Sequence, residues 1–499
     1  MLTRRDFLTA ASIPFLAGCS RGPSHGRTNV LFIAVDDLRP QLGCYGKSQI
    51  QSPNIDLLAS NGIRFDRAYC QQAVCAPSRI SLLTGLRPDS TTIYDLNHPM
   101  RQVIPEVISL PHHFRNNGYQ TVSLGKIYHH QNDDPEAWSA PDWRPKGDWA
   151  GRGYRDPESA RLVAESDAKT KAEYEAALAA GKQLNEPASG RGPAYEAPDV
   201  ADSDYPDGMV ADQAIRELRR LRDEPFFLAA GFFKPHLPFN APRKYWDLYS
   251  PDALEIPSQS DWPRGAPEIA RSNWGELRNY VGIPADGPVS EELARALIHG
   301  YYACVSYMDA QVGRVLDELA SLGLAERTAV VLWGDHGWKL NDYRAWCKHT
   351  NFEIDTHVPM ILSAPGRHGG QSTGALVEFV DIYPTLAELC GLDIPAHCEG
   401  TSMVPLLEDP AREWKRAAFS QYPRGRDRMG YSIRSGQWRY TEWIARDTGE
   451  IAARELYDHS AGPLAARNEA ADPARAGIVQ ELSALLAKGQ GWKAVREAL

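Results

Sequence analysis

Four apolar runs of strand length mark the first three quarters of the chain, and polar residues follow each of them. The runs cover residues 30–35, 120–124, 225–231 and 328–333. Because successive positions are apolar, rather than alternate ones, the pattern predicts strands buried on both faces, as in a central parallel sheet. The polar segments that follow are Asp36-Asp37, Gly125-Lys126, Lys234-Pro235-His236 and Asp335-His336. Ligands of open α/β sheets bind outside the carboxyl ends of the strands, so the pattern predicts a functional site at that edge.

Amphipathic segments between the apolar runs predict the helices that cover the sheet. Residues 212–221 and 291–319 carry apolar side chains at helical spacing. Strands that alternate with such segments are typical of an α/β fold. We therefore predict a large, mostly parallel central sheet flanked by helices.

Two segments differ in character from this framework. Residues 135–206 are rich in Trp, Gly, Pro and charged residues, with a helix expected near 168–180, and they resemble a surface insertion that shapes substrate access. From about residue 409, alternating segments at 430–434 and 437–443 predict antiparallel strands. The expected organisation is a large domain at 27–408 that holds the predicted site and a smaller C-terminal α+β subdomain at 409–499.

Composition narrows the classes of partner. The 499 residues are 43% hydrophobic, which excludes disorder, and the net charge of -10 argues against nucleic acid as a partner. An anionic ligand would therefore need a local basic pocket.

The first residues predict an export signal at 1–18. Arg4-Arg5 begins a twin-arginine pattern, and the apolar run at 10–17 is too short to span a bilayer. Cys19 closes a sequence that resembles a bacterial lipoprotein cleavage box, although a plain cleaved signal is the alternative. We expect the export machinery as a partner, a periplasmic or cell-envelope location, and membrane contact only through a lipid anchor at Cys19.

Cysteine usage allows one disulfide prediction. An oxidising compartment permits disulfides, and Cys390 and Cys398 would close a short loop. Cys70 and Cys347 are expected to be small buried residues.

Adjacent carboxylates follow the first strand. Asp36 and Asp37 repel one another unless a cation or a helix terminus compensates, and a helix cap is the simpler alternative. Asp335 and His336 follow a second buried strand. Because oxygen ligands dominate this set, it indicates calcium or magnesium rather than zinc, and we predict one calcium ion.

Cys75 lies at a predicted helix N-terminus. Pro77 has a backbone angle suited to a first helical turn, and the unpaired amides there favour an anion. Arg79 lies four residues on, hence on the same helix face. For an isolated cysteine, a buried structural thiol would be the simpler interpretation.

The segment Cys75-Ala76-Pro77-Ser78-Arg79 resembles the maturation signature of type I sulfatases, in which the cysteine is oxidised to formylglycine. Four further segments make the chain similar to the iduronate-2-sulfatase branch, from about residue 29 to about residue 468. They are Gly125-Lys126, residues 234–239, residues 335–338 and Tyr431-Ser432-Ile433-Arg434. The resemblance implies an alkaline-phosphatase-like fold, a maturation enzyme that produces formylglycine, and a sulfated saccharide as substrate.

The resemblance also implies a role for each site residue. The calcium ligands would be Asp36, Asp37, modified Cys75, Asp335 and His336. Asp335 would take a proton from the attacking diol, Arg79 and Lys126 would stabilise the diol and the sulfate, and His129 would deprotonate the second hydroxyl. The sulfate would be bound, and the leaving alcohol protonated, by His236 and Lys348. Asp134 aligns with an acidic position that contacts the sugar, and Trp338 could stack on a pyranose ring. The expected substrate is a 2-O-sulfated hexuronate at a chain end.

Two other functions remain open from the sequence. A phosphomonoester or phosphodiester hydrolase of the same superfamily would use a similar sheet and metal site. A surface lipoprotein that binds sulfated glycans without turnover would keep its binding when Cys75 is replaced by alanine. Isolated residues such as Lys126 or His129 are more often surface charges or hydrogen-bonded structural groups, and their shared position after predicted strands is what favours a site.

Overall fold

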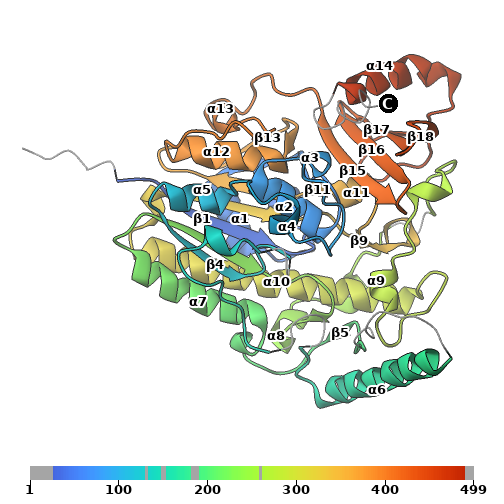
Figure 1. Ribbon diagram of the computed structural model, residues 1–499. Helices are drawn as coiled ribbons and strands as arrows, with labels where there is room; N and C mark the ends of the chain where they lie inside the picture. Colours follow the sequence, from blue (N-terminus) through green and yellow to red (C-terminus); the bar gives the residue numbers. More distant parts are fainter. Residues whose placement is uncertain (1–25, 130–132, 148–152, 181–189, 258–260, 489–499) are drawn as a thin grey trace, which may run out of the picture.

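The computed structural model describes residues 26–129, 133–147, 153–180, 190–257 and 261–488. A seven-stranded sheet forms the centre of this part of the molecule, in the order β13-β2-β12-β8-β1-β6-β4 (Figure 1). The strands are β1 (Asn29–Val35), β2 (Ile63–Phe65), β4 (Gln120–Gly125), β6 (Phe226–Phe232), β8 (Thr328–Gly334), β12 (Met360–Ser363) and β13 (Gln371–Thr373). The expected export signal at 1–18 and Cys19 lie outside the described residues.

The four strands predicted from the apolar runs lie side by side. β8, β1, β6 and β4 are parallel, which confirms the expected sheet, whereas β12 runs antiparallel to β8 and β2. Val35 is in register with Phe232 of β6 and with Gly334 of β8. The carboxyl ends of these three strands are therefore level, and the polar residues after them share one edge.

Alternate side chains of β1 pack into separate layers. Leu31, Ile33 and Val35 belong to the cluster on the face covered by three helices, α1 (Pro53–Ser60), α7 (Pro206–Leu221) and α10 (Glu291–Ser321). Val30 and Phe32 belong to the cluster on the opposite face, under α2 (Cys75–Thr84), α5 (Leu110–Asn116) and α12 (Ile382–Leu389). Burial on both faces explains the continuous apolar runs.

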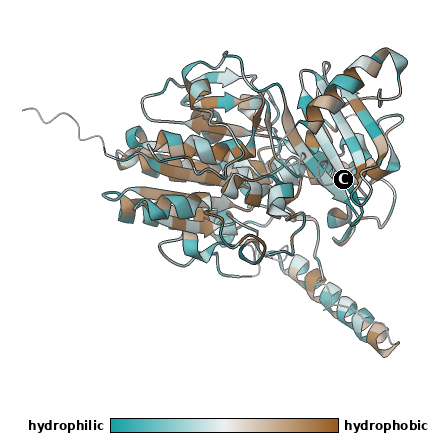
Figure 2. Cartoon of the chain, turned by 45° about the horizontal axis from the view of Figure 1, so that its top comes forward, coloured by the Kyte–Doolittle hydropathy of each residue, from teal (hydrophilic) through white to brown (hydrophobic). Residues whose placement is uncertain are grey.

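The insertion at 135–206 is attached to the body at both ends. Near its start, the amides of Ser139 and Trp143 donate to carbonyl oxygens of β4 (both 2.9 Å). Near its end, β5 (Tyr195–Glu196) pairs with β7 (Phe239–Asn240). Between them, α6 (Pro157–Ala179) is longer than expected and projects from the body (Figure 2).

The C-terminal part forms a separate antiparallel sheet, as the alternating pattern predicted. Its strands are β15 (Ala418–Arg424), β16 (Arg428–Ser435), β17 (Trp438–Ala445) and β18 (Ile451–Asp458). Met429, Ile433 and Tyr440 pack against Leu482 and Leu486 of α14 (Ala476–Ala487). Across the described residues, no helix combines the length and the apolar character needed to cross a membrane.

Short elements connect these layers. They are β3 (Ala68–Tyr69), α3 (Pro88–Thr91), α4 (Met100–Val103), α8 (Arg243–Trp246), α9 (Gly275–Arg278), β9 (Lys339–Leu340), β10 (Trp346–Cys347), α11 (Glu353–Thr356), β11 (His357–Val358), β14 (Val377–Glu378) and α13 (Val404–Glu408).

The disulfide expected between Cys390 and Cys398 is not present, because both are free thiols. Cys390 follows α12, and its Sγ lies 3.5 Å from the carbonyl oxygen of Thr28. Cys398 instead packs against Gly85. The two sulfur atoms thus pack against different segments, and spacing along the sequence did not reveal this.

Two glycines allow β4 and β6 to approach closely where they deliver site residues. Gly125 has a φ of +72°, and a Cβ atom added there would lie 2.2 Å from the carbonyl oxygen of Gly231. A Cβ atom added at Gly231 would lie 2.2 Å from the carbonyl oxygen of Lys126. The glycine pair therefore sets the position of Lys126.

We predict that Gly125→Ala destabilises the protein by about 3 kcal/mol or more, because backbone strain adds to a clash with backbone that cannot move aside. Gly366→Ala is the matched control, since Gly366 has a φ of +70° and open space around its Cβ position. The loss of stability in Gly366→Ala, about 1 kcal/mol, measures the backbone strain alone. Denaturant unfolding of both variants measures the difference, and equal losses would contradict the packing argument.

Candidate active site

The predicted site residues converge at the carboxyl edge of the sheet. Asp36 and Asp37 follow β1, Lys126 and His129 follow β4, His236 follows β6, Asp335 and His336 follow β8, Cys75 begins α2, and Lys348 follows β10. A cavity of about 560 Å³ opens over this edge. Its walls include Asp36, Cys75, Lys126, His129, His236 and Lys348.

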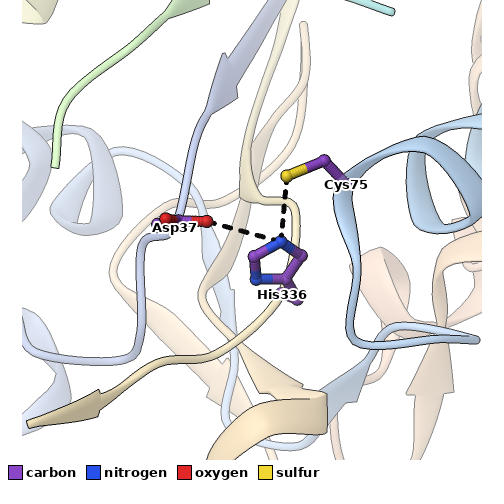
Figure 3. A group of neighbouring side chains, drawn as sticks. All are labelled: Asp37, Cys75 and His336. Carbon is purple, nitrogen blue, oxygen red and sulfur yellow. Dashed lines mark hydrogen bonds and ion pairs between the residues drawn. The ribbon is translucent and has the colours of Figure 1, made fainter. Parts of the chain in front are cut away.

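Cys75 is the first residue of α2, as Pro77 predicted. Its Sγ lies 3.3 Å from Nε2 of His336 (Figure 3) and 3.9 Å from Nζ of Lys126. Burial raises the pKa of the Cys75 thiol well above its usual value, despite the nearby charge of Lys126. The unmodified residue is therefore a neutral thiol and a poor nucleophile.

Arg79 bridges the carboxylates that follow two of the strands. Its Nη2 donates to Oδ1 of Asp36 and its Nε to Oδ2 of Asp335, both at 2.9 Å. Nη1 donates to the carbonyl oxygen of Ile127 at 3.0 Å. The guanidinium is 0% exposed, so in this structure it orients carboxylates rather than facing the cavity.

Carboxylates and a histidine gather beside Cys75 in a form that suits a divalent cation. Ligand atoms of Asp36, Cys75 and Asp335, and those of Asp37, Cys75 and His336, lie within 4.8 Å of one another in each group. Figure 3 shows Asp37, Cys75 and His336 facing a common centre, with Oδ1 of Asp37 3.4 Å from Nε2 of His336. Three carboxylates and one imidazole fit a hard cation such as calcium.

The two adjacent carboxylates have opposite pKa shifts. Burial raises the pKa of Asp36, but Lys126 and Arg79 outweigh it and bring the pKa well below its usual value. Burial raises the pKa of Asp37, and Lys348 and His236 do not fully offset it. Neighbouring side chains do not fully offset the cost of burying the charge of Asp37. This carboxylate is therefore suited to bind a cation.

Lys348 and His236 lie on the cavity side of Asp37. Nζ of Lys348 donates to Oδ1 of Asp37 at 3.0 Å, and Nε2 of His236 lies 3.8 Å from Oδ2. Burial lowers the pKa of His236, but the charges of Asp37 and Asp36 outweigh it and raise the pKa. The two carboxylates therefore favour the protonated form of the imidazole.

The two predicted sugar contacts are wrong, because both side chains are fully buried. Asp134 is 0% exposed; its Oδ1 accepts from Nε of Arg101 at 2.8 Å and its Oδ2 from the hydroxyl of Ser109 at 2.5 Å. Trp338 is also 0% exposed, and its ring lies 4.7 Å from Nζ of Lys348. The first residue orders a loop, and the second supports the lysine through a cation–π contact.

Two carboxylates that contact site residues or the segment carrying them were not found from the sequence. Glu276 of α9 contacts both Lys348 and His236, and no motif surrounds it. Asp207, at the start of α7, accepts from the amides of Phe233 and Lys234 at 2.7 and 3.0 Å, and burial raises its pKa to about 7. Asp207 could have been noticed as an acidic residue after the helix-initiating Pro206.

Comparison with known families decides the identity of this site. The family model described as Sulfatase matches residues 28–392, and the model described as N-sulphoglucosamine sulphohydrolase, C-terminal, matches residues 334–491. The chain is a sulfatase. The sulfatase is 34% identical to the iduronate 2-sulfatase of Mus musculus, across 91% of this chain and 93% of that protein, and 34% identical to that of Homo sapiens, across 88% and 90%.

Solved structures share the fold of the sulfatase. One, described as a complex with its substrate D-glucosamine-2-N,6-O-disulfate, has a TM-score of 0.74 at 22% identity, covering 94% of this chain and 98% of that one. The fold is alkaline-phosphatase-like, as expected, and the family is a type I sulfatase near the iduronate 2-sulfatase branch. The protein is thus a sulfuric ester hydrolase.

We predict that Asp134→Asn lowers stability by about 3 kcal/mol, because it leaves Arg101 without its buried partner, while kcat/KM changes by less than about threefold. Asp142→Asn removes a more exposed partner of Arg144 and costs less than about 1 kcal/mol. Thermal unfolding and saturation kinetics check both effects. A large rise in KM with unchanged stability would restore the sugar-contact role of Asp134.

Proposed function

We propose that this sulfatase removes sulfate from an anionic saccharide, with 2-O-sulfated hexuronate at a chain end as the preferred substrate. The observation that carries the proposal is the convergence of Cys75, the carboxylate cluster and the Lys348–His236 pair around one cavity. The identity to iduronate 2-sulfatases favours a sulfate ester over a phosphate ester, and it disfavours a glycan-binding protein without turnover.

Position 75 supplies the nucleophile after oxidation of Cys75 to formylglycine by a maturation enzyme. The aldehyde hydrate offers two hydroxyl groups. One oxygen attacks sulfur while Asp335 accepts its proton, the bond between sulfur and the sugar oxygen breaks, and the alcohol leaves. Deprotonation of the second hydroxyl by His129 then expels sulfate and restores the aldehyde.

The surrounding charges match this chemistry. Lys126 lies near the sulfur atom of position 75, and Lys348 and His236 carry positive charge toward the cavity. They are placed to bind the sulfate, and the protonated His236 can give its proton to the leaving alcohol. A calcium ion held by Asp36, Asp37, Asp335 and His336 would add positive charge beside the transferring group.

The wall of the cavity favours an anionic sugar. Arg144 and Arg191 of the insertion line it, and the Arg191 guanidinium lies 5.8 Å from the Tyr280 ring centre. Guanidinium groups recognise carboxylates in planar, paired geometry, which suits a uronate. Because the chain begins with a twin-arginine pattern, we also propose that the enzyme acts in the periplasm or cell envelope, anchored through Cys19.

We predict that the purified active enzyme carries formylglycine at position 75, which peptide mass spectrometry over residues 68–79 detects. Cys75→Ala is expected to lower turnover by a factor on the order of 10³ or more. A panel of sulfated disaccharides, with phosphate esters as the comparison, measures the specificity. An unmodified thiol in fully active protein would refute the mechanism, and a strict preference for 6-O-sulfated hexosamine would refute only the choice of sugar.

We predict an alkaline limit of kcat set by His236. Its pKa is raised above the ordinary histidine value, so the acid is present at lower pH and is lost as pH rises through that raised pKa. His236→Gln should remove this limb and lower kcat by about 10²- to 10⁴-fold. His349→Gln is the matched control, because burial lowers the pKa of His349 to about 3 and it stays neutral. An unchanged limb in His236→Gln would contradict the assignment.

A further inference from the structure

A carboxylate lies between the two cations that face the cavity. Oε1 of Glu276 lies 3.0 Å from Nζ of Lys348 and 3.1 Å from Nε2 of His236, and Oε2 lies 2.8 Å from the same Nζ. Lys348 and His236 are the groups expected to bind the sulfate. Glu276 therefore presents its oxygens to the donors that a sulfate ester would use.

The backbone that carries Glu276 is firmly held. The Arg278 guanidinium lies 3.3 Å from the Trp274 ring centre and donates to carbonyl oxygens of Asn273, Pro284 and Gly287 at 2.7–3.0 Å. A displacement of the carboxylate would therefore come from rotation of the side chain rather than from movement of α9.

The Glu276 side chain also borders a second cavity. It is 22% exposed, and it lines both the catalytic cavity and a neighbouring cavity bounded by Trp262, Arg271 and Tyr422. The guanidinium of Arg271, which pairs with Glu268 at 3.0 Å, also lines this neighbouring cavity. Among the described residues, its buried Nε has no hydrogen-bond partner.

We propose that Glu276 is a specificity-determining residue that competes with free sulfate for Lys348 and His236, and that it turns toward the neighbouring cavity when a sulfate ester binds. The inference rests on the proposed function, because it takes sulfate as the anion. An ester gains further contacts through its sugar and can displace the carboxylate, whereas inorganic sulfate lacks them. The product is thereby kept from occupying the site.

The charge balance supports this role. Lys348 is shared between Asp37 and Glu276, while His236 has its short contact with Glu276 and only a 3.8 Å contact with Asp37. Removal of the Glu276 charge would leave the buried Lys348 and the half-buried His236 with Asp37 as their remaining carboxylate partner. Such an arrangement favours binding of an external anion.

The test measures binding of inorganic sulfate to metal-loaded, full-length protein by isothermal titration calorimetry. Glu276→Gln should bind sulfate at least about tenfold more tightly than the unsubstituted enzyme, the gain of roughly one charge-assisted hydrogen bond. During turnover its progress curves should slow as sulfate accumulates. Glu276→Asp keeps the charge and should retain weak sulfate binding.

Glu268→Gln is the matched control, because it removes the same charge from the neighbouring cavity, where Glu268 pairs with Arg271. Its sulfate affinity should change by less than about twofold. Unchanged or weaker sulfate binding by folded Glu276→Gln would overturn the inference and leave Glu276 as a positioning residue. Absence of sulfate ester hydrolysis by the unsubstituted enzyme would instead overturn the proposed function, since the binding measurement needs no turnover.

Discussion

The site depends on one buried interaction, in which the Arg79 guanidinium donates hydrogen bonds to both Asp36 and Asp335. These carboxylates follow two neighbouring parallel strands, and without a cation between them their charges would repel at short range. The guanidinium is planar and always charged, so it binds both in a defined orientation. It also donates to the carbonyl oxygen of Ile127, which follows β4. One side chain on α2 thus joins three strand ends to the helix that presents Cys75.

Two lysine–carboxylate ion pairs lie next to the contacts of Arg79. Lys126 pairs with Asp36, Lys348 pairs with Asp37, and both lysines face the cavity. Because each lysine already has a carboxylate partner, part of its charge is offset before an anion binds. Affinity for a sulfate ester then depends on additional contacts to its sugar and on the nucleophile, which is a route to selectivity between substrate and product.

The backbone framework and the strand-end residues could be predicted from the sequence, because each is encoded by neighbouring residues. The apolar run of β1 predicts burial on both faces, and the residues after it then fall at the ligand-binding edge. Asp134 and Trp338 were misassigned because local sequence does not show whether a side chain faces a cavity or the core. Glu276 was missed for the complementary reason, since its partners Lys348 and His236 are distant in the chain and meet it only after folding.

Because the insertion is attached to the body at both ends, its length can change without disturbing the catalytic core. Residues 139–143 extend the edge of β4, and β5 pairs with β7, so the chain between them begins and ends at points held by backbone hydrogen bonds. Loop closure costs rise slowly with the number of residues in between. The length and sequence of this stretch, including α6, can therefore change without rebuilding the site at the strand ends.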